Sequence, residues 1–107
     1  MLEQQATGLQ SLAAEGALLA ADAARGRSTV TFVRVHAAEL AQAAGTSETL
    51  LAKGRTADTR VLTALARRTA ADLDRLSHSG SDRATARRLA ADLGRAAATA
   101  ERLGKRL

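Results

Sequence analysis

The sequence predicts an all-α protein, a single-domain antiparallel up-down four-helix bundle that covers residues 1–107. Apolar residues recur at alternating steps of three and four along nearly the whole chain, which is the spacing of one helix face. The chain has no Pro, no Ile and four Val, and this composition disfavours sheet. Short polar breaks divide the pattern into segments of similar length, which favours a bundle with short loops.

The first helix is predicted over residues 2–24, where the repeating positions run from Leu2 to Ala23. Gly26 is a plausible stop for it, and Ser28 is a plausible N-cap for the next helix. The second helix is predicted over 28–53, because the apolar phase from Val30 to Leu51 continues unbroken through Gly45. The alternative is a turn at Gly45 with a new N-cap directly after it.

The third helix is predicted over residues 56–77, with Gly54 at the C′ position of the helix before it and Thr56 as N-cap. The stretch "SHSGS" at 77–81 has the composition of a loop. The fourth helix is predicted over 81–106 with Ser81 as its cap, and its apolar positions give the cleanest pattern of the chain. Those positions are Ala86, Leu89, Leu93, Ala96, Ala100, Leu103 and Leu107.

Alanine dominates the apolar composition, accounting for 27 of the 49 hydrophobic residues, while Leu accounts for 16. Alanine favours helix but buries little surface, so the core should be thin and the helices should approach closely. In composition alone, the chain resembles phasin-like and apolipoprotein-like coats, which use long Ala-rich amphipathic helices. The Trp-x-Gly turn of small secreted helical hairpins has no counterpart, because the chain contains no Trp.

The net charge of +5 is unevenly distributed: residues 1–24 sum to −3 and residues 82–107 to +4. The first and last helices are neighbours in an up-down bundle, so this difference would favour that topology without adding much stability. Arg outnumbers Lys by 14 to 2, and together with the abundant Ala this suggests a bacterial genome of high GC content.

Basic residues of the last helix gather on the side opposite its leucines, and such a face is a candidate contact for the phosphates of a nucleic acid. The simpler interpretation is a solvated face with intrahelical ion pairs, such as Arg88 with Asp92 and Glu101 with Lys105. No aromatic residue is available there for base stacking. The candidate anion contacts are Arg83, Arg87, Arg95, Arg102 and Arg106, with Arg88 on the same side.

The stretch "TFVRVHAAEL" at 31–40 comes closest to a chemical site, and His36 admits three interpretations. A di-iron bundle needs Glu-x-x-His on two helices, whereas here Glu39 follows His36 and the other histidine, His78, falls in a predicted loop. A catalytic His36–Glu39 pair would need a nucleophile, and no nucleophile motif occurs. The favoured interpretation is structural: a boundary His36 that packs on Phe32 and donates its N–H to Glu39.

Phe32 and Val35 point away from the seam that Val33 and Leu40 predict, so a second apolar strip must be covered by something. The strip of Phe32, Val35 and His36, with Glu39 beside it, suits self-association or a partner helix. The alternative is a wider core face on a crowded bundle.

These observations predict a non-enzymatic bundle that acts by protein–protein contact, as a small bacterial accessory or scaffold protein with an unknown partner or a second copy. The alternative is a basic nucleic-acid-associated protein. No cofactor or metal is expected, and the lack of Cys excludes disulfides, thiolate metal sites and a Cys nucleophile. No stretch has the roughly 20 apolar residues of a membrane span. The start lacks the features of a signal peptide, which makes the cytoplasm the default compartment unless a leader has been removed.

Overall fold

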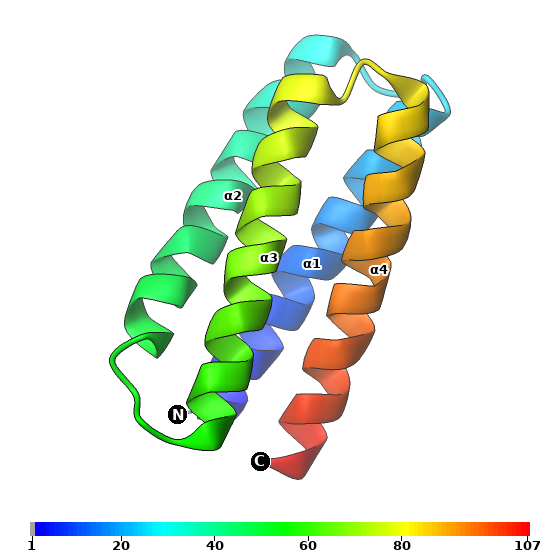
Figure 1. Cartoon of the computed structure of the whole chain (residues 1–107). Helices are drawn as coiled ribbons and strands as arrows, with labels where there is room; N and C mark the ends of the chain where they lie inside the picture. Colours follow the sequence, from blue (N-terminus) through cyan, green and yellow to red (C-terminus); the bar gives the residue numbers. More distant parts are fainter. Residues whose placement is uncertain (1) are drawn as a thin grey trace.

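The structure is a computed structural model that describes residues 2–107, and these residues form four α-helices and no strand. They run alternately up and down as α1 (Leu2–Ala24), α2 (Val30–Leu51), α3 (Ala57–Ser79) and α4 (Arg83–Arg106), as Figure 1 shows. The loops 25–29 and 80–82 lie at the upper end, and the loop 52–56 lies at the lower end (Figure 1). The molecule measures 41 × 21 × 17 Å, and the predicted four-helix bundle is confirmed.

The helices pack as two close pairs, α1 with α4 and α2 with α3, which meet along two looser contacts. We call these looser contacts the α1/α2 seam and the α3/α4 seam. Gly16 lets α1 approach the other pair, since a Cβ on Gly16 would lie 2.5 Å from Cδ2 of Leu73 and 3.3 Å from Cδ1 of Leu93. The predicted adjacency of α1 and α4 is therefore confirmed. No ion pair joins these two helices in residues 2–107, so small side chains and not opposite charges make the contact.

The core consists of two clusters stacked along the bundle, and both are rich in Ala and Leu. The upper cluster contains Leu19, Ala20, Ala23, Val33, Ala37, Leu40, Ala44, Leu73, Leu76, Ala86, Leu89 and Leu93. The lower cluster contains Ala6, Leu9, Ala13, Leu51, Leu62, Leu65, Ala66, Ala96, Ala100 and Leu103. Burial of these periodic positions leaves the remaining faces of each helix to solvent, and those faces decide what the molecule can bind.

Gly26 ends α1 as predicted, with φ of +69° in the left-handed region that favours glycine. Its N–H donates to the Ala23 carbonyl at 3.1 Å, and the N–H of Arg27 donates to the Asp22 carbonyl at 2.9 Å, which is the Schellman pattern. Gly54 is different, because its φ is not positive and it does not form the predicted left-handed stop. The side chain of Thr59 lies over Gly54 instead, and it leaves no room for a Cβ there.

For most of the helix ends, the observed boundary differs from the predicted one by one or two residues. The N-cap of α2 is Thr29 and not Ser28, since the Thr29 hydroxyl accepts from the N–H of Phe32 at 3.1 Å. The N-cap of α4 is Asp82 and not Ser81. Thr56 caps α3 as predicted, accepting from the N–H of Thr59 at 3.1 Å.

Helix α2 is continuous through Gly45, as the unbroken apolar phase predicted. The prediction of a loop from residue 77 was wrong, because α3 continues to Ser79 and includes His78. The hydroxyl of Ser77 donates to the Asp74 carbonyl at 2.6 Å, and Nδ1 of His78 lies 2.8 Å from the same oxygen. These polar side chains fold back onto their own helix, so their composition does not end it.

Candidate functional site

Phe32 and His36 stand one turn apart on α2 and stack as predicted. Their ring centroids are 5.5 Å apart, and the rings are inclined by only 7°. An offset stack of this kind is worth about 0.5–1.5 kcal/mol beyond the area that it buries. The stack fixes both rings on the side of α2 that borders α1, because His36 also contacts that helix.

The carboxylate that His36 contacts belongs to Glu15 of α1 and not to Glu39, so the predicted pairing with Glu39 was wrong. Nε2 of His36 lies 3.4 Å from Oε2 of Glu15. The side chain of Glu39 is exposed and lies further around α2, on the solvent side. Both members of the observed pair are partly exposed, with 34 % of the His36 side chain and 58 % of the Glu15 side chain open to water. In residues 2–107 no group of three or more His, Asp or Glu side chains could hold a metal ion.

Three large apolar side chains on the same two helices stay open to solvent, and one of them, Phe32, stacks on His36. Leu18 is 70 % exposed, Phe32 is 54 % exposed and Val35 is 50 % exposed. Leu18 follows Glu15 by three residues and Phe32 precedes His36 by four, and the two helices run in opposite directions. Both side chains therefore lie one turn above the Glu15–His36 contact. We call Leu18, Phe32, Val35, Glu15 and His36 together the α1/α2 surface.

Charge is scarce on α1 and α2. These helices carry one basic and five acidic residues, and the basic residue, Arg34, lines the groove toward α3. Helices α3 and α4 carry eleven basic and five acidic residues. Helices α1 and α2 therefore form a weakly charged acidic half, and α3 and α4 form a densely charged basic half.

The predicted anion contacts on α4 are all exposed, but they do not share one surface. The guanidinium of Arg83 lies against Gly26, within 2.6 Å of the place that a Cβ would take, so Arg83 covers the loop between α1 and α2. Arg87 follows one turn later on that edge. Arg95 and Arg102 face outward beside α3, where Arg95 pairs with Asp92 and Arg102 donates to the Thr99 hydroxyl at 3.2 Å. Arg106 extends that row toward the lower end.

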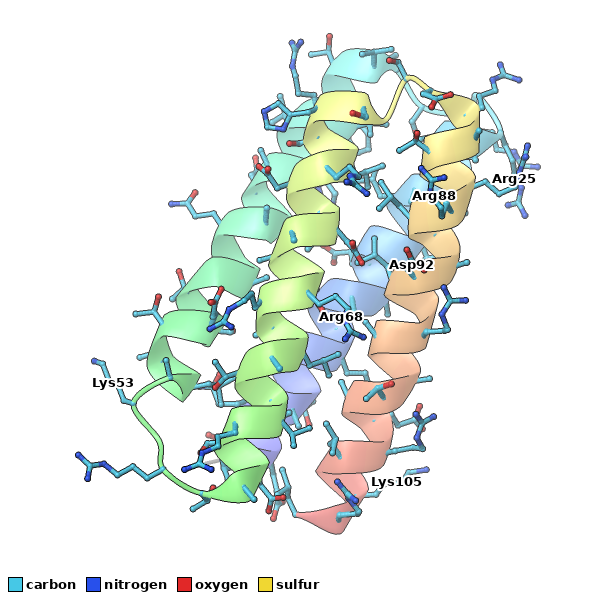
Figure 2. All side chains as sticks on the ribbon, viewed as in Figure 1. Arg25, Lys53, Arg68, Arg88, Asp92 and Lys105 are labelled. Carbon is cyan, nitrogen blue, oxygen red and sulfur yellow. The ribbon has the colours of Figure 1, made fainter. Side chains whose placement is uncertain are left out.

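Sequence reasoning missed the arginines of α3 that face the same seam, Arg60, Arg68 and Arg75. Arg68 lines a shallow pocket together with Asp72, Asp92 and Arg95, and Figure 2 looks onto this seam. Arg68 and Arg75 are seven residues apart and keep one helix phase, so the sequence contained their signal. Arg60 is rotated by about 80° from Arg68, although it lines a pocket together with Arg68 and Thr99. Paired with the α4 row, they form three levels of two arginines, Arg75 with Arg88, Arg68 with Arg95 and Arg60 with Arg102. We call these six residues the arginine ladder.

Two carboxylates lie close to each other across this seam, Asp72 on α3 and Asp92 on α4. The pKa of Asp72 is raised from its ordinary value, chiefly because the side chain is partly buried and next because Asp92 faces it; Arg75 and Arg68 act in the opposite direction. Helices α3 and α4 are antiparallel, and Asp72 and Asp92 lie at about the same height along the bundle. A step of seven residues along α3 therefore covers the same height as a step of seven residues back along α4. The two acids lie at the base of the seam, and the arginines stand outside them.

A third groove, between α2 and α3, holds polar groups that already have partners. Nε of Arg67 donates to Oε2 of Glu48 at 2.9 Å across the groove. His78 contacts the carbonyl and the carboxylate of Asp74 on its own helix. The predicted loop position of His78 is thus replaced by a self-contained contact on α3.

Within residues 2–107, the helices lack the long apolar run that crossing a bilayer requires. Comparison of the chain with known protein families, with curated proteins and with solved structures finds no match.

Proposed function

We propose that this protein is a non-enzymatic helical bundle that acts by protein–protein contact through the α1/α2 surface. The observation that supports this proposal most strongly is that Leu18 of α1 and Phe32 and Val35 of α2 are each half or more exposed. Five of the six large apolar side chains that stay exposed belong to α1 and α2, and a concentration of exposed apolar residues is typical of a contact site. These side chains include the one aromatic residue of the chain, a residue type that is enriched in protein interfaces.

The scarcity of charge around these side chains supports the same proposal. Protein interfaces are depleted of charged residues in their central part and keep charge at the rim. Here Glu15 and Glu39 border the apolar side chains, and α2 carries three charged residues along its whole length. A helix face designed only for solvation would carry the density of charge that α4 carries, nine residues in a similar length.

The acidic rim favours a partner with basic flanks. Helices α1 and α2 have a net charge of −4, so a second α1/α2 surface brought against the first would meet like charge. An amphipathic helix with an apolar stripe bordered by Lys or Arg would bury Leu18, Phe32 and Val35 and pair with Glu15 and Glu39. Such a helix is the partner that we propose.

The test is an NMR titration of the ¹⁵N-labelled protein with a synthetic amphipathic peptide that has a Leu stripe flanked by Lys. We expect amide shifts to concentrate at Leu18, Phe32 and Val35. Replacing both exposed aliphatic side chains, Leu18→Ser with Val35→Ser, should weaken binding by about tenfold or more, since each loses about 1 kcal/mol of apolar burial. The matched control is Val61→Ser, which removes an exposed Val from α3 and should leave affinity unchanged.

The same spectra distinguish the two kinds of partner. Shifts at those amides on raising the protein concentration without peptide would show that a second copy occupies the surface. Absence of shifts there in both titrations would rule out the proposal. The free energy of unfolding of each variant shows whether it is still folded. Substitutions at exposed positions should change it by no more than about 0.5 kcal/mol.

A further inference from the structure

The α3/α4 seam carries the arginine ladder, and Figure 2, which looks onto this seam, labels two of its members, Arg68 of α3 and Arg88 of α4. We infer that the arginine ladder binds the sugar–phosphate backbone of a nucleic-acid duplex. This inference goes beyond the proposed protein contact and involves different residues. It also differs from a row confined to α4, because half of the ladder comes from α3.

Spacing supports a linear polyanion as the ligand. Arg88, Arg95 and Arg102 are separated by seven residues each, which places their Cα atoms about 10.5 Å apart along the helix. One strand of a duplex carries a phosphate about every 3.4 Å of axis, so successive levels meet about every third phosphate. The ladder extends along α3 from Arg60 to Arg75, a rise of 15 residue steps, which is about 22 Å and less than one turn of B-DNA.

Most of the ladder is available for such contacts. In residues 2–107, no ion pair within 4.0 Å engages Arg60, Arg68, Arg75 or Arg88. Arg95 pairs with Asp92, but its side chain is 71 % exposed while that of Asp92 is 36 % exposed. A phosphate approaching the seam therefore meets guanidinium groups before it meets a carboxylate.

The surrounding side chains favour a duplex over other anions. Single-stranded nucleic acids bind through stacking on aromatic residues, and α3 and α4 contain no Phe, Tyr or Trp. An anionic membrane is bound by amphipathic helices that insert large apolar side chains between basic ones. Near the ladder Val61 is the one large apolar residue that is well exposed, and it lies at the lower end. Backbone contact with a duplex needs neither feature.

The experiment is fluorescence anisotropy with labelled duplexes of about 20 bp, one of DNA and one of RNA, between about 50 and 200 mM salt. Contact with four to six phosphates predicts a slope of log affinity against log salt of roughly −3.5 to −5.5. The double variant Arg68→Gln with Arg88→Gln should lose about tenfold or more in affinity and lower the slope by about 2. Neither residue makes an ion pair within 4.0 Å, so far-UV circular dichroism should stay unchanged and the melting temperature should change little.

The matched control is Arg25→Gln with Arg27→Gln, which removes the same charge from the exposed loop between α1 and α2. It should change affinity by no more than about threefold, since it acts only through the net charge. Asp72→Asn removes an acid from the seam and should strengthen binding, the opposite sign to the arginine variants. A preference for the DNA or the RNA duplex with this pattern of variants supports the inference and identifies the duplex.

Three outcomes would overturn the inference. Absence of binding to both duplexes at the lowest salt is the first. Equal losses in the ladder variant and in the loop variant are the second, because they would show attraction by net charge alone. Binding to phosphatidylserine vesicles without binding to either duplex is the third, because it would make a membrane surface the ligand.

Discussion

The α1/α2 half and the α3/α4 half of this bundle solve the same packing problem with different outer faces. Each half contributes about the same number of helical residues, 45 and 47, and each contributes Leu and Ala to both core clusters. Outside the core, the first half carries six charged residues and the second carries sixteen. Exposed large apolar residues show the reverse distribution: five of six belong to α1 and α2.

This difference shows that the requirements of folding alone do not explain the outer faces of α1 and α2. The pattern of α3 and α4, with apolar seams and charged exteriors, is sufficient to form and solubilise an antiparallel bundle. Helices α1 and α2 satisfy the core pattern equally well but leave Leu18, Phe32 and Val35 in water. We attribute these exposed apolar side chains to ligand binding. We therefore propose a different ligand for each half of the bundle.

The largest effect is expected where the two close helix pairs meet, at Gly16. Gly16→Ala should lower the free energy of unfolding by about 1–2 kcal/mol, because overpacking against the buried Leu73 outweighs the gain in helix propensity. Gly94→Ala on α4 is the control, since nothing lies within 4 Å of a Cβ there, and it should stabilise by about 0.5–1 kcal/mol. Urea unfolding measures the free energies of unfolding of the two variants. Equal stabilisation by Gly16→Ala and Gly94→Ala would contradict the close approach of α1 to Leu73.

The next effect concerns the α3 side of the core. Thr69 is fully buried, and its Oγ1 has no hydrogen-bond partner. Thr69→Val should stabilise the fold by about 1–2 kcal/mol, because it replaces an unsatisfied hydroxyl by a methyl group of the same shape. Thr63→Val should not, since the Thr63 hydroxyl donates to the Thr59 carbonyl at 2.6 Å. Thermal unfolding of the two variants decides the matter, and a destabilised Thr69→Val would indicate an undetected partner.

A smaller effect tests the continuity of α2. Gly45 lies inside the helix, and a Cβ there would meet nothing within 4 Å. Gly45→Ala should raise the free energy of unfolding by about 0.5–1 kcal/mol through helix propensity alone. Measured by urea unfolding, a loss of stability would instead favour a turn at this position and would place the exposed strip on a broken helix.

The smallest effect is the pH dependence of the α3/α4 seam. A raised pKa of Asp72 means that the folded state binds its proton more tightly than the unfolded state. The ordinary pKa of Asp72 is 3.8. The contribution of Asp72 to stability therefore falls as the pH rises from 3.8 through the raised pKa of the folded state. Asp72→Asn should remove this loss and stabilise the protein at pH 7 by less than about 1 kcal/mol, since the group is partly exposed.

Asp82 at the start of α4 should show the opposite sign. The Thr85 hydroxyl donates to its carboxylate and lowers the pKa, so its contribution is present above 3.8 and is lost as pH falls through the lowered value. Urea unfolding from about pH 3 to 7 separates these contributions when wild type is compared with Asp72→Asn and Asp82→Asn. Parallel curves for all three proteins would show that neither carboxylate is linked to folding.

Much of the architecture was predictable because helical periodicity acts locally. The apolar phase predicted the continuity of α2 through Gly45, and the spacing of Phe32 and His36 predicted their stack. Helix ends were less predictable, because adjacent residues such as Ser28 and Thr29 can supply the same capping hydroxyl.

The side-chain contacts between different helices could not be predicted from the sequence. The Glu15–His36 contact depends on the rotation and relative height of α1 and α2, and periodicity specifies neither. The arginine ladder depends on α3 and α4 passing each other level at Asp72 and Asp92. The protein contact and the nucleic-acid contact both stay predictions, since the fold is compatible with either ligand alone.

The division of the bundle into two contact surfaces is tested most directly by mapping amide shifts of one labelled protein in two separate titrations, with duplex and with the amphipathic peptide. We expect the duplex to shift amides around Arg68 and Arg88 and to leave Leu18, Phe32 and Val35 unmoved. We expect the peptide to do the reverse. Shifts from both ligands at the same helices would contradict the division.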